Sequence, residues 1–359
     1  MQARTPVSII TGFLGSGKTT LLNHVLQDPA MAGAAVIINE FGEIGLDHLL
    51  IATPNENTVL LASGCICCTV RGDLVDTMRN LERQRRKGEL PPFDRVLIET
   101  TGLADPVPIM QTVVADEQIA PRFEMDGVLT LVDAVNGMAQ LDQQTEAVKQ
   151  AAVADRLVLT KTDLFSDTNT LRERLTRMNP GAQHLEARHG KIEASQLFGL
   201  GLTPRADTGE FARWLPVQAV ARAESLYTRT GNHHDDSVRS YCLTLDEPVS
   251  RSGMTAWLTA LASLRGANLL RVKALLNVDG APVAVHAVQT LIHEPIELAR
   301  WPDDDRRSRI VFITRDMSRE DIERTLDMLC LRTVNNSPTP QPLDPAAYAK
   351  FVAAMKKIH

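Results

Sequence analysis

The stretch Gly12-Phe13-Leu14-Gly15-Ser16-Gly17-Lys18-Thr19 matches the phosphate-binding pattern G-x-x-x-x-G-K-[ST]. The β-branched run Val7–Thr11 precedes it and predicts a buried strand, and Leu21–Gln27 after it has a helical pattern. A strand must deliver such a loop, and a helix must begin at its end, since the free N–H groups of a first helical turn favour a bound anion. The stretch therefore predicts a nucleotide-binding protein.

The residues of this loop have distinct expected tasks. Glycines allow backbone angles that a Cβ would forbid, so successive N–H groups can turn toward the phosphates. We expect Lys18 to reach the β- and γ-phosphates and the Thr19 hydroxyl to bind Mg²⁺, which gives both a catalytic role. The predicted phosphate-binding residues are Gly12, Gly15, Ser16, Gly17, Lys18, Thr19 and Thr20.

Composition limits the classes of function. The chain has 359 residues, of which 44% are hydrophobic and 23% charged, as in soluble globular proteins of one large domain or two. A net charge of −6 argues against a general nucleic-acid binder, and no apolar stretch is long enough to predict a membrane span. The densest basic run, Arg83-Gln84-Arg85-Arg86-Lys87, is interpreted as the solvated end of a helix. Five cysteines, three of them within four positions, do not resemble a disulfide framework, so we expect a cytoplasmic protein.

Strands alternate with helices along the first part of the chain, which predicts an α/β domain with a doubly wound, mostly parallel sheet over residues 1–205. In such sheets ligands bind at the carboxyl ends of the strands. The expected strands are Val7–Thr11, Ala35–Asn39, Thr58–Leu61, Arg95–Glu99, Gly127–Val132 and Arg156–Leu159. The expected helices between them include Leu74–Arg86, Pro106–Ala115 and Leu171–Met178.

The rest of the chain predicts a linker over residues 206–236 and a second, smaller α+β domain over 237–333. A Pro-rich segment and a short helix are expected over 334–359. In the second domain, strands at Val238–Leu245, Leu270–Asn277, Pro282–Ile292 and Ile310–Thr314 are combined with helices at Gly253–Leu264 and Arg319–Cys330. Asp279-Gly280 predicts a hairpin between two of these strands. The order is compatible with a ferredoxin-like arrangement.

Guanine is the base that the loop Thr160-Lys161-Thr162-Asp163 favours, because it follows a predicted strand where GTPases read the base. A carboxylate at Asp163 can accept hydrogen bonds from N1–H and the N2 amine of guanine, and adenine offers neither donor. The stem of Lys161 would cover the base plane, while Thr160 replaces the asparagine that usually begins this motif. Ala187-Arg188-His189-Gly190 is a candidate for backbone contacts to the base.

Two further segments are candidates for coupling to the γ-phosphate. Glu99 ends a predicted strand and can hold Mg²⁺ through water, and the N–H of Gly102 can contact the γ-phosphate, so both are predicted to be catalytic. Asn39-Glu40-Phe41-Gly42-Glu43 and the segment after Gly102 are candidate switches. Several acidic groups could orient the attacking water, and the sequence does not choose among them.

Three thiols, Cys65, Cys67 and Cys68, stand in Gly64-Cys65-Ile66-Cys67-Cys68 just after a predicted strand. Thiolates prefer zinc, copper(I) or similar metals to magnesium, and three sulfurs leave a fourth position for another ligand. Packing as small hydrophobic residues, or a redox pair, are the alternatives. Cys242 and Cys330 fall in apolar patterns and are expected in the core. His233-His234-Asp235-Asp236 is either an accessory metal site or an exposed loop.

Five motifs, G-F-L-G-S-G-K-T-T, N-E-F-G-E, G-C-I-C-C, E-T-T-G-L-A-D-P and T-K-T-D, together resemble the CobW-type GTPases, which are related to the urease and hydrogenase maturation GTPases. The resemblance covers nearly all of residues 6 to 190, and the C-terminal half is similar to the family's second domain. A histidine-rich stretch common in the family is reduced here to His233-His234.

The resemblance implies GTP and Mg²⁺ at the phosphate loop, with nucleotide contacts from Asn39, Lys161, Asp163 and Arg188, and Zn²⁺ or another transition metal at Cys65, Cys67 and Cys68. It implies a GTP-hydrolysing metallochaperone whose partner is a client metalloenzyme that receives the metal. Neither nucleic acid nor membrane is expected as a partner, and a homo-oligomer is left open. The alternatives are a metal sensor or store with negligible GTP turnover, and a small-molecule kinase.

Overall fold

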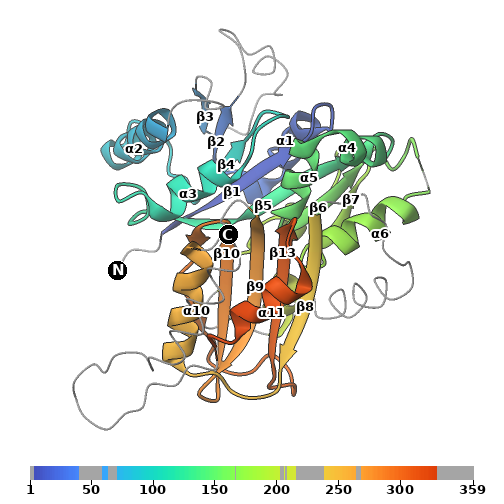
Figure 1. The fold of residues 1–359 in the computed structure, drawn as a ribbon. Coiled ribbons are helices and arrows are strands. Elements are labelled where there is room, and N and C mark those ends of the chain that lie inside the picture. The colour runs from blue at the N-terminus through green and yellow to red at the C-terminus, as the bar shows by residue number, and fades with distance from the viewer. Residues whose placement is uncertain are drawn as a thin grey trace. The chain divides into compact units, whose positions relative to one another are not determined.

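A computed structural model describes residues 4–39, 59–63, 71–165, 167–202, 206, 208–215, 238–263 and 268–329. The chain divides into two compact units, residues 1–202 with 210–227, and residues 203–209 with 228–359 (Figure 1). Several predictions lie outside the described residues: the switch residues 40–43, the three clustered cysteines, His233-His234, Cys330 and the C-terminal segment. The boundaries predicted at residues 205, 236 and 333 stay predictions.

One sheet organises the first unit, and among the described residues it has seven strands in the order β3-β2-β4-β1-β5-β6-β7. Every neighbouring pair is parallel, which confirms the doubly wound α/β domain. All six expected strands are present, to within a few residues at their ends. The strands are β1 (Thr5–Gly12), β2 (Ala34–Asn39), β3 (Val59–Ser63), β4 (Arg95–Glu99), β5 (Phe123–Asp133), β6 (Arg156–Thr160) and β7 (Gln183–Ala187).

Helices connect these strands and bury their apolar faces (Figure 1). α1 begins at Lys18, before the predicted Leu21, because Gly17 with φ 89° is the residue at which the loop turns into the helix. Leu21 and Leu22 of α1 pack against Ile10 and Leu129 of the sheet, so one apolar core holds both sides of the loop. The helices are α1 (Lys18–Val25), α2 (Arg71–Lys87), α3 (Val107–Ala115), α4 (Gly137–Gln143), α5 (Thr145–Ala152), α6 (Asn169–Met178), α7 (Ala194–Leu197) and α8 (Thr208–Trp214), with a short 3-10 turn at Pro29–Met31.

The parallel arrangement determines where the functional residues lie. The carboxyl ends of parallel strands meet at one edge of a sheet, and ligands bind there. Almost every predicted site residue of the first unit ends a strand or directly follows one. The last residues of the seven strands, from β1 to β7, are Gly12, Asn39, Ser63, Glu99, Asp133, Thr160 and Ala187.

The second unit is built on an antiparallel sheet in the order β11-β10-β9-β13-β8, with β12 paired to β10. Helix α10 connects β8 to β9, which lie on the two sides of β13, so the unit contains a split βαβ arrangement. The rings of Trp257 and Phe312 pack edge to face in the core of this unit, with 6.1 Å between their centroids. The elements are β8 (Val238–Leu245), α10 (Arg251–Ser263), β9 (Leu269–Val278), β10 (Ala281–Val288), β11 (Leu291–Ile292), β12 (Ile296–Glu297), β13 (Ser308–Arg315) and α11 (Arg319–Leu326).

One strand prediction in this unit is wrong. The segment expected as a single strand over 282–292 is divided, because Gln289, with φ 51°, turns the chain back and β11 pairs antiparallel with β10. The hairpin at Asp279-Gly280 is confirmed, with φ values of 51° and 95°. Cys242 is confirmed as a core residue, only 6% exposed. Within the described residues no helix is both long enough and apolar enough to cross a bilayer.

Candidate functional site

The phosphate loop runs from Gly12 at the end of β1 to the first turn of α1. Gly12 has φ 144°, and a Cβ at this position would lie 2.5 Å from the carbonyl oxygen of Leu131 on β5. No larger residue fits this close approach. The loop is therefore held against the sheet. This close contact explains why the motif requires glycine at position 12.

Lys18 lies over this loop. Its Nζ donates hydrogen bonds to the carbonyl oxygens of Gly12, at 2.8 Å, and Phe13, at 3.2 Å. These two carbonyls hold the ammonium group at the loop, where the motif places the β- and γ-phosphates. Lys18 thus lies at the loop where it is predicted to act, and its catalytic role stays a prediction.

Thr19 and Glu99 come together although 80 residues separate them. The Thr19 hydroxyl donates a hydrogen bond of 3.2 Å to Oε1 of Glu99, which is only 7% exposed at the end of β4. A hydroxyl and a carboxylate are the hard oxygen ligands that Mg²⁺ takes, directly or through water. The donor set at this point of the sheet edge fits a magnesium ion.

The segment after Glu99 packs directly on the phosphate loop. A Cβ added at Gly102 would lie 2.6 Å from the backbone nitrogen of Leu14, so this position also requires glycine. Thr100 links the segment to β1, since its hydroxyl donates a hydrogen bond of 2.8 Å to the Thr11 hydroxyl. Gly102 is thus a neighbour of the loop, in keeping with the predicted contact between its N–H and the γ-phosphate.

Gln150 of α5 is a residue that the sequence did not reveal. Its side chain is fully buried and donates from Nε2 to the carbonyl oxygens of Gly102, at 3.1 Å, and Ala104, at 2.9 Å. Its neighbour Lys149 forms an ion pair of 3.7 Å with Asp105. No local pattern could reveal this role, because the two bonds of Gln150 join residues 48 and 46 positions apart. Helix α5 therefore holds the candidate switch segment in place.

The base-reading loop after β6 is connected to the phosphate loop through Thr160. Its hydroxyl donates hydrogen bonds to the carbonyl oxygens of Ser16, at 2.8 Å, and Val132, at 3.3 Å. Thr160 lacks the side-chain amide of the asparagine that usually begins this motif, but its hydroxyl reaches the phosphate loop and braces it.

Lys161 is fixed by Asp133 at the end of β5, with 2.7 Å between Nζ and Oδ2. Burial raises the pKa of Asp133, but hydrogen bonds from Lys161, from Asn136 and from the backbone N–H groups of Val135 and Asn136 lower it by more, so the pKa lies below its ordinary value of 3.8. The Lys161 backbone takes the left-handed conformation, with φ 57°. The aliphatic part of the Lys161 side chain is thus held in place at the loop that is predicted to bind the base.

Asp163 faces the loop after β7. Its Oδ2 lies 3.3 Å from Nδ1 of His189, and its side chain is 19% exposed, so the carboxylate is accessible to a ligand. Gly190 packs on α1, since a Cβ there would lie 2.9 Å from the methyl group of Thr20. Arg188 is exposed over 70% of its side chain and forms an ion pair of 3.6 Å with Glu186. The two predicted base-binding loops therefore meet beside the phosphate loop.

The predicted thiol site, Cys65, Cys67 and Cys68, lies outside the described residues, as do residues 40–43 and the side chain of Asn39. The chain that carries the thiols leaves the sheet at Ser63, the carboxyl end of β3, and re-enters the described structure at Arg71, where α2 begins. Among the described residues no group of three or more His, Cys, Asp or Glu side chains is placed to hold a metal ion. The described residues thus offer no cluster of this kind that would compete with the thiols for zinc.

Comparison with known families identifies both parts of the chain. Residues 6–186 match the nucleotide-binding domain described as CobW/HypB/UreG, and residues 238–330 match the cobalamin synthesis protein CobW C-terminal domain. The first match alone covers half of the chain.

Several proteins with similar sequences are named zinc chaperones. The chain is 36% identical over 318 residues to the zinc chaperone YjiA of Escherichia coli, which covers 88% of this chain and 96% of that protein. It is 29% identical over 346 residues to the zinc chaperone CobW of a Sinorhizobium species, covering 87% and 93%. A crystal structure of the Zn(II)-bound YjiA GTPase from E. coli superposes with a TM-score of 0.70 at 31% identity and covers 91% of this chain and 99% of that one.

Proposed function

Because the chain belongs to the CobW/HypB/UreG family of nucleotide-binding proteins, we propose that it is a GTP-hydrolysing zinc chaperone that passes its metal to a client protein. The observation that carries the proposal is the single sheet edge at which four features gather. The phosphate loop, the Thr19–Glu99 pair and the base-reading loop lie there, and the chain that bears the three thiols begins there at Ser63.

GTP is the substrate that the base-reading loop favours. The Asp163 carboxylate can accept two hydrogen bonds from the N1–H and N2 amine of guanine, whereas adenine would leave it without donors. Thr160 holds the base-reading loop to the carbonyl of Ser16, so base and phosphate sites keep a constant separation. Arg188 extends into solvent on the neighbouring loop, where it can approach a bound nucleotide.

Hydrolysis requires charge stabilisation around the γ-phosphate, and the chain's own residues supply it. Lys18 and the loop N–H groups neutralise the phosphate oxygens, and Gly102 lies against the loop at Leu14. Thr19 and Glu99 would hold Mg²⁺, which when bound draws charge from the β- and γ-oxygens. Gln150 keeps the Gly102 segment in position for the γ-phosphate.

Zinc is the proposed cargo of Cys65, Cys67 and Cys68. Three thiolates suit Zn²⁺ and leave one coordination position free, through which a client ligand could enter. The relatives named above are zinc chaperones, which supports zinc over the other thiophilic metals. A nucleotide can control the metal only if the GTP-bound and GDP-bound states differ in zinc affinity.

The test measures zinc affinity of the full chain with a GTP analogue, with GDP and without nucleotide. We expect tight binding with the GTP analogue that weakens with GDP, and loss of tight binding in C65S/C67S/C68S with nucleotide binding retained. Cys242→Ala is the matched control, because this thiol is buried on β8 of the second unit. Equal zinc affinity in all three nucleotide states would contradict the coupling, and an unchanged affinity in the triple variant would contradict the thiol site.

Lys18→Ala then separates a chaperone from a store. Zinc release to a metallochromic chelator, followed after addition of GTP, should depend on Lys18 if hydrolysis drives it. A store that only binds GTP would release zinc at the same rate in both proteins.

A further inference from the structure

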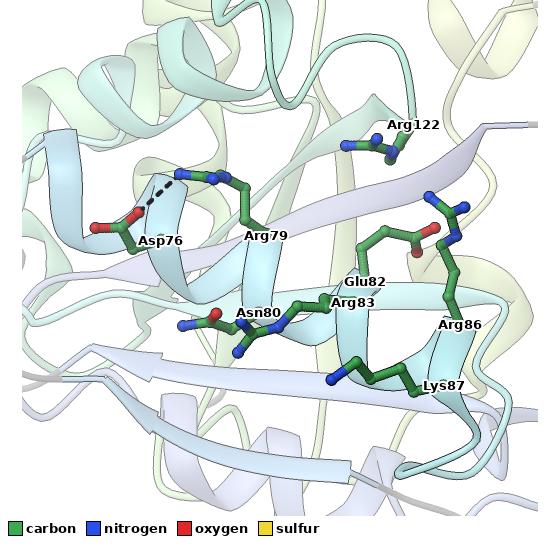
Figure 2. A pocket seen from close by; sticks show the side chains of 8 residues that line it. All are labelled: Asp76, Arg79, Asn80, Glu82, Arg83, Arg86, Lys87 and Arg122. Atoms are coloured by element: carbon green, nitrogen blue, oxygen red, sulfur yellow. Dashed lines mark hydrogen bonds and ion pairs between the residues drawn. The ribbon is translucent and has the colours of Figure 1, made fainter.

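A basic pocket on the outer face of α2 has no part in the site described above. It has a volume of about 570 Å³, and its cations are Arg79, Arg83, Arg86 and Lys87 from α2 and Arg122 from the turn before β5 (Figure 2). All five of these side chains are exposed. In a chain of net charge −6, such a concentration of positive charge is a local exception.

Not all of the basic run serves the pocket. Arg85 is a structural residue, since it pairs with Glu82, donates hydrogen bonds of 3.1 Å to the Thr5 hydroxyl and 3.2 Å to the Phe93 carbonyl, and lies 4.5 Å from the centre of the Phe93 ring. Lys87 pairs with Glu89 at 3.5 Å. The expectation of a solvated helix end is therefore correct for only part of the run.

Three guanidinium groups are left without a carboxylate partner. Among the described residues, Arg83 and Arg86 make no ion pair or hydrogen bond, and Arg122 makes one long hydrogen bond of 3.4 Å to the carbonyl of Gln118. The two carboxylates of the pocket are already engaged, Asp76 with Arg79 at 3.2 Å and Glu82 with Arg85. Guanidinium groups bind carboxylates and phosphates through two parallel hydrogen bonds, so this pocket presents free anion-binding groups.

We propose that the α2 basic pocket, formed by Arg79, Arg83, Arg86, Lys87 and Arg122, is a docking site for an acidic segment of a partner protein. From Arg79 to Lys87 the helix rises about 12 Å, which corresponds to about four residues of an extended peptide. A ligand with several carboxylates along its length fits this spacing better than one compact anion.

Nucleic acid fits the pocket less well. None of the described residues that line it is aromatic, and single strands are usually bound by stacking their bases on aromatic rings. Asp76 and Glu82 stand among the cations, but both are paired with arginines, so the preference for a peptide over nucleic acid depends on the aromatic residues and not on these two carboxylates.

Helix α2 connects the thiol-bearing segment to the docking site. It begins at Arg71, three residues after Cys68, and Arg79 lies eight residues further along it, so about 12 Å of helix separates the start of α2 from the first cation of the pocket. Only the identification of this partner with the zinc client rests on the proposed function. The charge recognition itself does not depend on GTP or on zinc.

The experiment titrates the full chain with fluorescein-labelled hexaglutamate at low ionic strength, with hexaglutamine as the uncharged control. We expect saturable binding of hexaglutamate that weakens about tenfold in R83Q/R86Q and falls steeply with added salt. R239Q/R300Q is the matched control, because it removes the same charge from two exposed arginines of the second unit, and it should keep the wild-type affinity.

Both variants should fold, since α2 packs through Leu74, Met78 and Leu81 on its buried face, and the two arginines of the control variant are exposed. Unchanged affinity for a GTP analogue checks this, and it also keeps a failure of the pocket distinct from a failure of the proposed function. Equal weakening by both variants, or no binding of hexaglutamate, would overturn the proposal. A dodecameric oligothymidylate or inorganic tripolyphosphate that binds more tightly, and loses this affinity in R83Q/R86Q, would also overturn it by assigning the pocket to phosphates.

Discussion

The hydroxyl of Thr160, at the end of β6, donates a hydrogen bond of 2.8 Å to the backbone carbonyl of Ser16, 144 residues earlier in the phosphate loop. This bond joins the segment that is to select the base to the segment that is to bind the phosphates. A threonine thus performs, with one hydroxyl, the bracing for which the motif usually employs an asparagine. The bond leads directly to a first prediction.

Thr160→Val removes this hydroxyl at nearly constant volume. The buried carbonyl oxygens of Ser16 and Val132 then lose a donor, and we expect the free energy of unfolding to fall by about 1–3 kcal/mol and the affinity for GTP to fall with it. Urea unfolding and calorimetric titration with a GTP analogue measure the two effects. Thr160→Ser keeps the hydroxyl and is the control. If valine and serine behave alike, the bond does not brace the loop.

Glu99→Gln tests the predicted magnesium site. The glutamine amide keeps the hydrogen bond to Thr19 available but removes the charge that attracts Mg²⁺. We expect the Mg²⁺ concentration for half-maximal GTP hydrolysis to rise by about 10–100-fold. Thr19→Ser, which retains a hydroxyl, should stay near the wild type. An unchanged Mg²⁺ requirement in Glu99→Gln would place the ion elsewhere.

Gly102→Ala tests the contact with the phosphate loop. The new Cβ would lie 2.6 Å from the backbone nitrogen of Leu14, so either the loop or the Gly102 segment must shift. A displacement of about 1 Å from the reacting groups can reduce the rate of a reaction by about 100-fold, and we expect a loss of this order in the rate of GTP hydrolysis. Single-turnover kinetics separate this loss from a loss of binding. Gly201→Ala, where the backbone is outside the left-handed region and an added Cβ would lie 3.8 Å or more from its neighbours, controls for removal of a surface glycine.

Asp163→Ala tests the choice of base. A carboxylate that pairs with guanine donors and is left unpaired by adenine can discriminate strongly, so its loss should reduce the preference for GTP over ATP at least about 100-fold. His189→Ala removes the neighbour of Asp163 at 3.3 Å and should keep the preference. Competition of GTP and ATP for a fluorescent GTP analogue measures both. A preference that survives in Asp163→Ala would mean that another group reads the base.

Asp133→Asn tests the support of Lys161 through its pH dependence. The pKa of Asp133 in the folded protein lies below 3.8, so the folded state holds the proton less tightly than the unfolded state does. The stabilisation by this carboxylate is therefore complete above about pH 5 and is lost as the pH falls through the folded pKa. The difference in unfolding free energy between wild type and Asp133→Asn should be constant from pH 7 to about pH 5 and should shrink below about pH 4. A difference that grows on acidification would contradict the pairing.

Much of the first unit could be predicted because its signals are local. The strands at Arg95–Glu99 and around Val7 are short β-branched runs, and the phosphate loop is a continuous motif. The division at Gln289 was missed because the polar pair Gln289-Thr290 is short and apolar residues precede and follow it, so periodicity gives no clear sign of a turn. Gln150 was missed because its partners are far away in the chain.

The nucleotide loop, the α/β fold class and the motifs can be predicted from the sequence, because each depends on residue types within a few positions of one another. The three-dimensional fold was needed to show that Thr160 braces Ser16 and that Glu99 meets Thr19. It also shows that Arg85 is structural, whereas Arg83 and Arg86 are free to bind an anion. These relationships depend on strand order and on which side of a helix is buried. Strand order brings together residues that the chain separates, and burial decides which charges find a partner inside the protein.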